Sequence, residues 1–264
     1  MAIAENINFA SLNIKSGHLE VRLAENNMEI DAAQALRYKV FFEEMDAVSN
    51  ANQKKLKRDI DLYDHFFDHI LVIDHKISGK IHKKVVGTYR LNRGLKKNKF
   101  YTSDEFDITK LIKYKGDILE LGRSCVNKDY RNGNTMQMLW RFIAQYVIKY
   151  NIDIMFGCAS FPGIEHQLYS KTFSYMYKKY LAPENIRPVA LANKRIPLNS
   201  VTNENLTFKQ FLSSIPPLIK GYIRLGAFIG DGAVIDAEFN TVDVCIVLPT
   251  KKVSSRYMEH YERK

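Results

Sequence analysis

The sequence predicts an α/β fold of the mixed α+β type, with helices flanking a central sheet that contains a bulge. Residues 117–160 contain a buried strand pattern, an amphipathic helix pattern and a second buried strand pattern. Such a succession indicates a crossover helix between two parallel or splayed strands. Residues 69–92 contain two strand patterns separated by a polar loop, which indicates an antiparallel pair. The expected sheet is therefore mixed.

Length and composition are those of an ordinary globular protein of 264 residues. The formal net charge of +10 implies acidic company, whether nucleic acid, an anionic membrane surface or an acidic carrier protein. Three widely spaced cysteines indicate no disulfide framework, and the seven histidines have no metal-ligand spacing, so no metal is expected. The sequence shows no signal peptide and no membrane span, so a cytoplasmic location is expected.

We expect residues 1–18 to form an N-terminal segment and residues 19–264 to form a single domain. From residue 181 the composition shifts towards Pro and Asn. Residues 181–264 are therefore expected to be a C-terminal extension packed on the same core.

The first elements are a strand near residues 18–26, where apolar and polar residues alternate, and a helix near residues 28–45. Arg37 lies within the apolar stripe of that helix, and an inward guanidinium requires a carboxylate partner. Either Asp61 or Asp64, in the candidate loop that follows, is the expected partner.

The later elements follow the same periodicities, and the pair Pro216 and Pro217 separates the last two helices. Strands are expected at residues 69–74, 84–92, 117–126, 152–160, 227–236 and 242–249, and helices at residues 135–150, 208–215 and 218–225.

The stretch ELGRSCVNKDYRNG places two opposite charges, Glu120 and Arg123, inside an apolar strand. In a regular strand these two side chains would point to opposite faces. Gly122 indicates a β-bulge or a close backbone approach, and a bulge would turn both charges into one cleft. It would also free a backbone N–H for a developing oxyanion.

The turn after this strand contains Arg131, Asn132, Gly133, Asn134 and Thr135 and leads into a helix. Unpaired N–H groups and the helix dipole favour a phosphate at such a position. We therefore expect a phosphate site, with a simple capped helix start as the alternative.

This strand, turn and helix resemble the acyl-donor motif of the GNAT acyltransferases, V-x-P-x-x-R-G-x-G-x-G/A, in which Val126 and Arg131 match. Asn132, Asn134 and Met136 replace small residues of that motif. The departure favours a donor with a single phosphodiester, such as the phosphopantetheine arm of acyl carrier protein, over coenzyme A. The positive charge of the chain suits this acidic carrier.

Most of residues 20–250 resemble the ornithine N-alpha-acyltransferases of ornithine-lipid synthesis, through ELGRSCV, FGCASFPG and PPLIKGYIRLGA. The related autoinducer synthases share a wider pattern with this chain: Arg37 and Phe41, Asp61 and Asp64, Arg90 within GTYRL, and Glu120 and Arg123. They are shorter, however, and lack the PPLIKGY extension. An autoinducer synthase or another N-acyl amino acid synthase is therefore the alternative.

The resemblance implies an N-acyltransferase that moves a 3-hydroxyacyl group from acyl carrier protein to the α-amine of ornithine, giving a lyso-ornithine lipid. Acyl carrier protein is then the protein partner and its thioester a co-substrate. No tightly bound cofactor is implied.

Glu120 and Arg123 are the expected catalytic residues, with Glu120 accepting the amine proton directly or through water. Either Arg37 or Arg123 holds the carboxylate of ornithine, and either Asp61 or Asp64 holds its distal ammonium.

Phe41 and Arg90 join the substrate-binding set through the same resemblance. Pairing of the charged residues with one another is the alternative to substrate binding. Ser160 and Tyr169 are candidates for protonating the departing thiolate, and Cys158 is interpreted as a small buried hydrophobe.

A basic protein that binds nucleic acid or a lipid surface would explain the charge equally well. The sequence contains no helix-turn-helix, zinc-finger or RNP motif, so no nucleic acid partner is expected. The apolar segment LSSIPPLIKGYIRLGAF, which carries spaced cations, is the candidate for peripheral contact with an anionic inner membrane.

Overall fold

The computed structural model describes residues 12–95, 99–201 and 205–251. These residues fall into two compact units. Within the described ranges, the first unit contains residues 12–40, 51–91 and 123–151, and the second contains residues 41–50, 92–122 and 152–251. Most of the expected N-terminal segment, residues 1–11, lies outside the described part of the chain. One domain over residues 19–264 stays a prediction.

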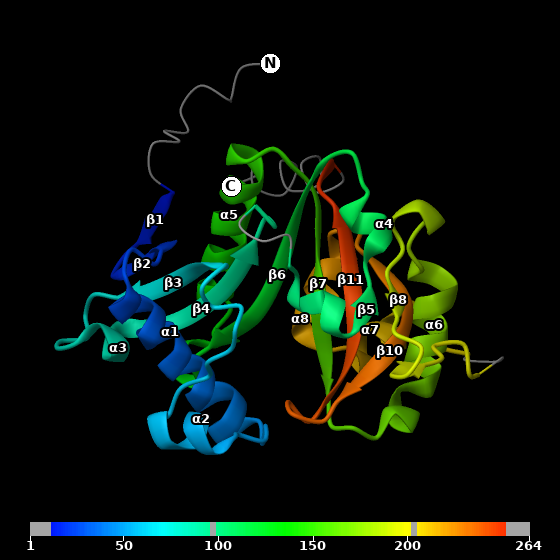
Figure 1. Cartoon of the computed structure of the whole chain (residues 1–264), viewed down its shortest axis with the longest axis horizontal. Helices are drawn as coiled ribbons and strands as arrows, with labels where there is room; N and C mark the ends of the chain where they lie inside the picture. Colours follow the sequence, from blue (N-terminus) through cyan, green and yellow to red (C-terminus); the bar gives the residue numbers. More distant parts are fainter. Residues whose placement is uncertain (1–11, 96–98, 202–204, 252–264) are drawn as a thin grey trace. The chain divides into compact units, whose positions relative to one another are not determined.

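The first unit contains four antiparallel strands in the order β1–β2–β3–β4, and helix α5 packs against three of them (Figure 1). The antiparallel pair expected within residues 69–92 is therefore confirmed. The bounds are β1 (Asn13–Ser16), β2 (Leu19–Leu23), α1 (Asn27–Tyr38), α2 (Ala51–Leu56), β3 (Asp68–Asp74), α3 (Ile81–Lys84), β4 (Val85–Asn92), the 3₁₀ turn η3 (Lys128–Tyr130) and α5 (Asn134–Lys149).

The second unit contains a mixed sheet, because β6 pairs with β7 in parallel while β7 pairs with β11 and β11 with β10 in antiparallel fashion. Strand β6 (Asp117–Val126) begins in this unit and ends in the first. The other bounds are η2 (Tyr101–Asp104), β5 (Phe106–Asp107), α4 (Thr109–Ile112), β7 (Ile152–Pro162), η4 (His166–Tyr169), α6 (Ser170–Tyr180), η5 (Glu184–Ile186), β8 (Val189–Ala190), β9 (Arg195–Ile196), α7 (Phe208–Ser214), α8 (Pro217–Arg224), β10 (Phe228–Asp236) and β11 (Thr241–Pro249).

The helix expected near residues 28–45 is shorter than predicted. Helix α1 ends at Tyr38, and residues Lys39–Glu44 continue as a π-helix (η1). Apolar periodicity does not distinguish the two, because a wider turn changes the spacing only slightly. Asn26 caps α1, since its side chain accepts a hydrogen bond from the backbone N–H of Glu29 at 3.1 Å.

Helix α6 has no counterpart among the predicted elements. Its buried face combines Phe173 and Met176 with the polar residues Thr172 and Ser174, which hide the apolar stripe. The Ser174 hydroxyl donates to the backbone oxygen of Leu198 at 3.0 Å, so its burial is satisfied.

At Gly157 of β7, the backbone of β6 lies too close for a side chain. A Cβ at Gly157 would lie 2.1 Å from the backbone oxygen of Leu121, so no other residue fits without displacing a strand. Residues Asp117 to Glu120 of β6 pair with β7.

The segment expected to contact a membrane, residues 212–228, belongs to the second unit and is partly buried. Ile215, Ile219, Tyr222 and Ile223 are buried, whereas Leu212, Leu218, Leu225 and Phe228 are half-buried, and peripheral contact with a membrane stays a prediction. Among the residues that the structure describes, no helix has the length and apolar character needed to cross a bilayer.

Candidate functional site

Arg123 carries the backbone irregularity that was expected at Gly122. Its φ is +52°, a left-handed value that is uncommon for a residue other than glycine. A Cβ at Gly122 would meet no atom within 4 Å, so the close approach expected there is wrong and lies at Gly157 instead. The left-handed backbone therefore lies one residue after the predicted position, and the pairing of β6 with β7 also shifts register between Asp117 and Ile118.

Arg37 is fully buried and paired with carboxylates, as the sequence predicts. Its Nε lies 2.8 Å from Oδ2 of Asp59, and its Nη1 lies 2.8 Å from Oδ1 of Asp64. Asp64 was an expected partner. Asp59 was not expected as a partner. The other candidate, Asp61, does not pair with Arg37 but binds Arg90 and Arg123.

Arg90 and Arg123 complete a cluster of charges in the first unit. Nη1 of Arg90 lies 2.7 Å from Asp61 and 3.0 Å from Asp64, and its guanidinium stacks over the Phe67 ring. Arg123 binds the third aspartate, with Nε 3.2 Å from Oδ2 of Asp59, and reaches Asp61 at 3.4 Å. The distances join three arginines to three aspartates: Arg37, Arg90 and Arg123 with Asp59, Asp61 and Asp64. We call this set the Arg–Asp cluster.

The electrostatics of the cluster hold Asp61 and Asp64 ionised. Burial alone would raise the pKa of Asp64, but Arg37 and Arg90 outweigh it and hold that pKa well below the usual range. Asp61 behaves alike, because Arg90 and Arg123 lower its pKa against the effect of burial. The expected site residues therefore pair with one another, which is the alternative to substrate binding that the sequence left open.

Exposure separates the six members of the cluster into two kinds. The side chains of Arg37, Arg90, Asp59 and Asp64 are between 0% and 3% exposed. Arg123 is 11% exposed and Asp61 19%. Within the described residues, these two form the edge of the cluster that solvent reaches.

Glu120 lies in the second unit and anchors the turn η2. Its Oε1 accepts hydrogen bonds from the backbone N–H and the hydroxyl of Thr102 at 2.6 and 2.7 Å. Its Oε2 accepts from the N–H of Tyr101 at 3.2 Å and from Nδ2 of Asn92 at 3.4 Å. Burial raises the pKa of Glu120 above its ordinary value, although the hydrogen bonds from Thr102 oppose the shift.

The recorded contacts of the two expected catalytic residues belong to different units. Glu120 contacts the turn η2 and Arg123 contacts the Arg–Asp cluster. A cleft shared by their side chains stays a prediction. Phe41, also expected at the substrate site, lies in the π-helix and packs edge-on against Phe239, with ring centroids 5.6 Å apart.

Four of the five residues expected to bind a phosphate before α5 are exposed, and the phosphate site stays a prediction. Arg131, Asn132, Gly133 and Asn134 are exposed, and Gly133 caps the helix with a φ of +89°. Arg131 closes the turn because its Nε donates to the backbone oxygen of Val126 at 2.9 Å. Thr135 is the exception, since its side chain is fully buried and only its backbone remains for a phosphate.

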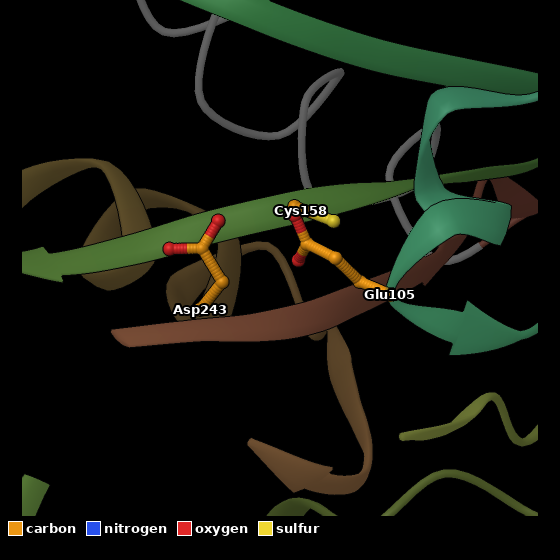
Figure 2. A group of neighbouring side chains, drawn as sticks. All are labelled: Glu105, Cys158 and Asp243. Carbon is orange, nitrogen blue, oxygen red and sulfur yellow. The ribbon is translucent and has the colours of Figure 1, made fainter. Parts of the chain in front are cut away.

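A second group of ionisable side chains lies in the second unit. Glu105, Cys158 and Asp243 place their ligand-type atoms within 4.8 Å of one another. Figure 2 shows these side chains, of which Glu105 directly follows η2, Cys158 lies on β7 and Asp243 on β11. Burial and Glu105 raise the pKa of the Cys158 thiol well above its ordinary value. Because a metal ligand or a nucleophile must be a thiolate, we assign neither role to Cys158.

The two candidates for protonating the thiolate differ in their surroundings. Ser160 is exposed on β7. The hydroxyl of Tyr169 donates to the backbone oxygen of Pro162 at 2.5 Å, and burial raises its pKa. Neither role is tested by these contacts.

Comparisons with known proteins give similarity over nearly the whole chain. An acetyltransferase (GNAT) domain model matches residues 36–141. The L-ornithine N(alpha)-acyltransferase of Agrobacterium fabrum is 44% identical over 93% of this chain and 85% of its own length. That of Brucella abortus is 42% identical, over 93% and 89%. Among solved structures, FeeM, an N-acyl amino acid synthase from uncultured soil microbes, is 10% identical with a TM-score of 0.49, over 90% of this chain and 93% of FeeM.

Proposed function

Because this chain belongs to the family of L-ornithine N(alpha)-acyltransferases and has the GNAT fold, we propose that it transfers a 3-hydroxyacyl group from acyl carrier protein to the α-amine of ornithine. The product is a lyso-ornithine lipid. The thioester bond of the donor breaks, an amide bond forms, and the thiol of the phosphopantetheine arm leaves with a proton.

The observation that carries the substrate assignment is the exposure of Arg123 and Asp61 at the edge of the Arg–Asp cluster. Ornithine presents a carboxylate and a distal ammonium. The carboxylate pairs with Arg123 and the ammonium with Asp61. Arg37 and Asp64, the other two candidates for these roles, are buried and bound to each other, so they support the site from behind.

The reacting amine must be neutral, and an α-amine loses its proton more readily than a side-chain amine. Glu120 is the proposed proton acceptor, and its raised pKa makes it a stronger base than an ordinary carboxylate. Both of its oxygens already accept hydrogen bonds. We therefore favour transfer of the proton through a water molecule over direct contact.

The exposed turn before α5 is the proposed site of the donor phosphate. The first backbone N–H groups of a 16-residue helix have no acceptor within the helix, although that of Asn134 donates to Oδ1 of Asn132 at 3.2 Å, and the helix dipole favours an anion. The single phosphodiester of a phosphopantetheine arm suits a turn in which asparagines replace glycines. The net charge of +10 complements the acidic surface of acyl carrier protein.

The test is transfer by the purified protein from 3-hydroxyacyl carrier protein to a panel of amino acids, with products identified by mass spectrometry. The panel contains ornithine, lysine, glycine and S-adenosylmethionine, and each acceptor is tried with acyl coenzyme A as well. We expect amide formation on the α-nitrogen of ornithine. A lactone from S-adenosylmethionine would instead support an autoinducer synthase, and acylation of none would contradict the proposal.

We also propose that the protein binds peripherally to the inner membrane, because its product is a lipid. Flotation of the protein with vesicles of anionic and of neutral phospholipid tests it. Binding to anionic vesicles that salt reverses is expected, and equal partitioning into neutral vesicles would contradict a charge-driven contact.

A further inference from the structure

We propose that Asp59 is a positioning residue that fixes the direction of the Arg123 guanidinium for the amino-acid substrate. The inference rests on the proposed function, in which Arg123 binds the substrate carboxylate. Asp59 was not among the residues singled out from the sequence.

Asp59 is held on three sides. Its backbone N–H donates to the backbone oxygen of Gln34 at 3.1 Å, and its backbone oxygen accepts from Nη2 of Arg37 at 2.5 Å. Its Oδ2 accepts from Nε of Arg37 at 2.8 Å. The residue is 1% exposed, so its carboxylate has little freedom to turn.

The same oxygen, Oδ2, accepts from Nε of Arg123 at 3.2 Å. A contact at Nε fixes the rotation of a guanidinium about its last bonds and therefore the direction of its Nη groups. Arg123 is the member that needs this restraint, because its side chain is partly exposed and its backbone is left-handed. Binding of a carboxylate by two parallel hydrogen bonds depends on that direction.

The second oxygen of Asp59 makes a sharp variant possible. Oδ1 is buried and has no hydrogen-bond partner within the part of the chain that the structure describes. In Asp59→Asn the amide oxygen therefore takes the place of Oδ2, and the NH₂ group takes the place of Oδ1 without facing a donor. The variant keeps both contacts to arginine and removes only the charge, whereas Asp59→Ala removes the contacts as well.

The experiment compares Asp59→Asn, Asp59→Ala and a control, Asp31→Asn, in the full chain. Asp31 binds Arg58 with two contacts of 2.7 and 2.9 Å in the same unit, outside the cluster. Each variant is assayed with ornithine and with 1,4-diaminobutane, which lacks the carboxylate. The KM of the acyl donor and the Tm are measured in parallel.

For Asp59→Ala we expect the preference for ornithine, which is the ratio of kcat/KM for ornithine to kcat/KM for the diamine, to fall about tenfold or more. A guanidinium that points in another direction no longer forms two parallel hydrogen bonds with the substrate carboxylate. Asp59→Asn should keep the preference within about threefold although its Tm falls, and Asp31→Asn should keep both. If Asp59→Ala does not fold, Asp59→Ser replaces it.

An unchanged preference in a folded Asp59→Ala or Asp59→Ser variant would overturn the inference. An equal loss of preference in Asp59→Asn would also overturn it, because charge rather than direction would then be the cause. Failure of the proposed function is a separate outcome, since the unaltered protein would then show no acylation of ornithine in the same assay.

Discussion

Arg123 unites a left-handed backbone, two aspartate partners and partial exposure in one strand residue. A left-handed conformation costs an ordinary residue about 1 kcal/mol or more, so its retention here suits a residue with a role in function. Arg123→Lys keeps the positive charge and removes the planar fork.

We expect Arg123→Lys to raise the KM for ornithine at least about tenfold and to leave the KM for the acyl donor nearly unchanged, because a lysine cannot bind a carboxylate by two parallel bonds. Steady-state kinetics with each substrate varied in turn checks this. Arg58→Lys, at a partly exposed pair in the same unit, is the matched control. Equal effects on both KM values would count against the carboxylate role.

Glu120 has two possible duties, and Glu120→Gln separates them. Its amide oxygen can still accept the two bonds from Thr102, which hold η2 in place. Its NH₂ group cannot accept from Tyr101 or Asn92. We expect turnover to fall about 100-fold with a Tm lowered by only a few degrees, because the proton acceptor is lost while the turn stays anchored.

The pH profile distinguishes a base from an anchor. The raised pKa of Glu120 predicts that kcat/KM falls on the acid side at a pH above that of an ordinary glutamate, about 4.3. Glu120→Gln should lack this limb. If the limb persists in the variant, another group accepts the proton.

His69 makes the stability of the first unit depend on pH. Burial and the nearby Arg37 lower its pKa to about 4, so the folded protein holds it neutral. An unfolded histidine binds a proton below a pH of about 6.5, and the stability contributed by the neutral ring is therefore lost as pH falls from about 6.5 to 4. We expect the unfolding free energy to fall by roughly 2 kcal/mol in this window. Urea titrations at several pH values, with His69→Asn as the variant of flatter slope, check this; an equal slope in both would contradict it.

The turn between β6 and α5 is an element whose two ends are tied to different strands. Arg131 donates to Val126 at the end of β6, and the hydroxyl of Tyr130 donates to Asp74 at the end of β3. The contact with Asp74 raises the pKa of Tyr130 to about 12, so the hydroxyl keeps its proton at neutral pH. These contacts fix the turn where the donor phosphate is proposed to bind.

Loss of either tie should weaken binding of the donor more than binding of the amino acid. We expect Arg131→Ala to raise the KM for the acyl donor about tenfold, because it removes a charge as well as a contact, and Tyr130→Phe to raise it about threefold. Kinetics with both substrates varied measure this. A larger effect on the KM for ornithine would place the donor elsewhere.

Much of the secondary structure follows from the sequence because the pattern is local. The strands β3, β4, β6, β7, β10 and β11 lie within a few residues of the expected ranges, since each is a short apolar run between turn residues. Helix α6 escaped prediction because Thr172 and Ser174 lie on its buried face, where a local rule assigns polar residues to solvent.

The candidate site is only partly predictable, because its contacts join distant parts of the chain. A buried guanidinium at Arg37 requires an acid, and this rule correctly indicated Asp64. It cannot choose between Asp59 and Asp61, since their assignment depends on how the loop folds over α1. The left-handed backbone of Arg123 likewise cannot be predicted from the sequence, because arginine usually avoids that conformation.

For the whole molecule, the net charge of +10 makes the encounter with an acidic donor depend on salt. We expect the KM for acyl carrier protein to rise about tenfold between about 50 and about 500 mM salt, because screening weakens attraction between opposite charges. A short acyl-pantetheine donor is the control and should show little change. A salt-independent KM for the carrier would contradict charge-driven docking.

The three arginines of the Arg–Asp cluster balance the charges of its three aspartates, and this balance limits which substitutions the chain tolerates. Replacing Arg37 or Asp64 alone leaves a buried charge uncompensated, which costs roughly 3–5 kcal/mol, a large part of the stability of most domains. Single mutations at these positions are therefore selected against whatever their effect on the acceptor. Changes of acceptor preference in relatives should accumulate at Asp61 and Arg123, where water can take the place of a lost partner.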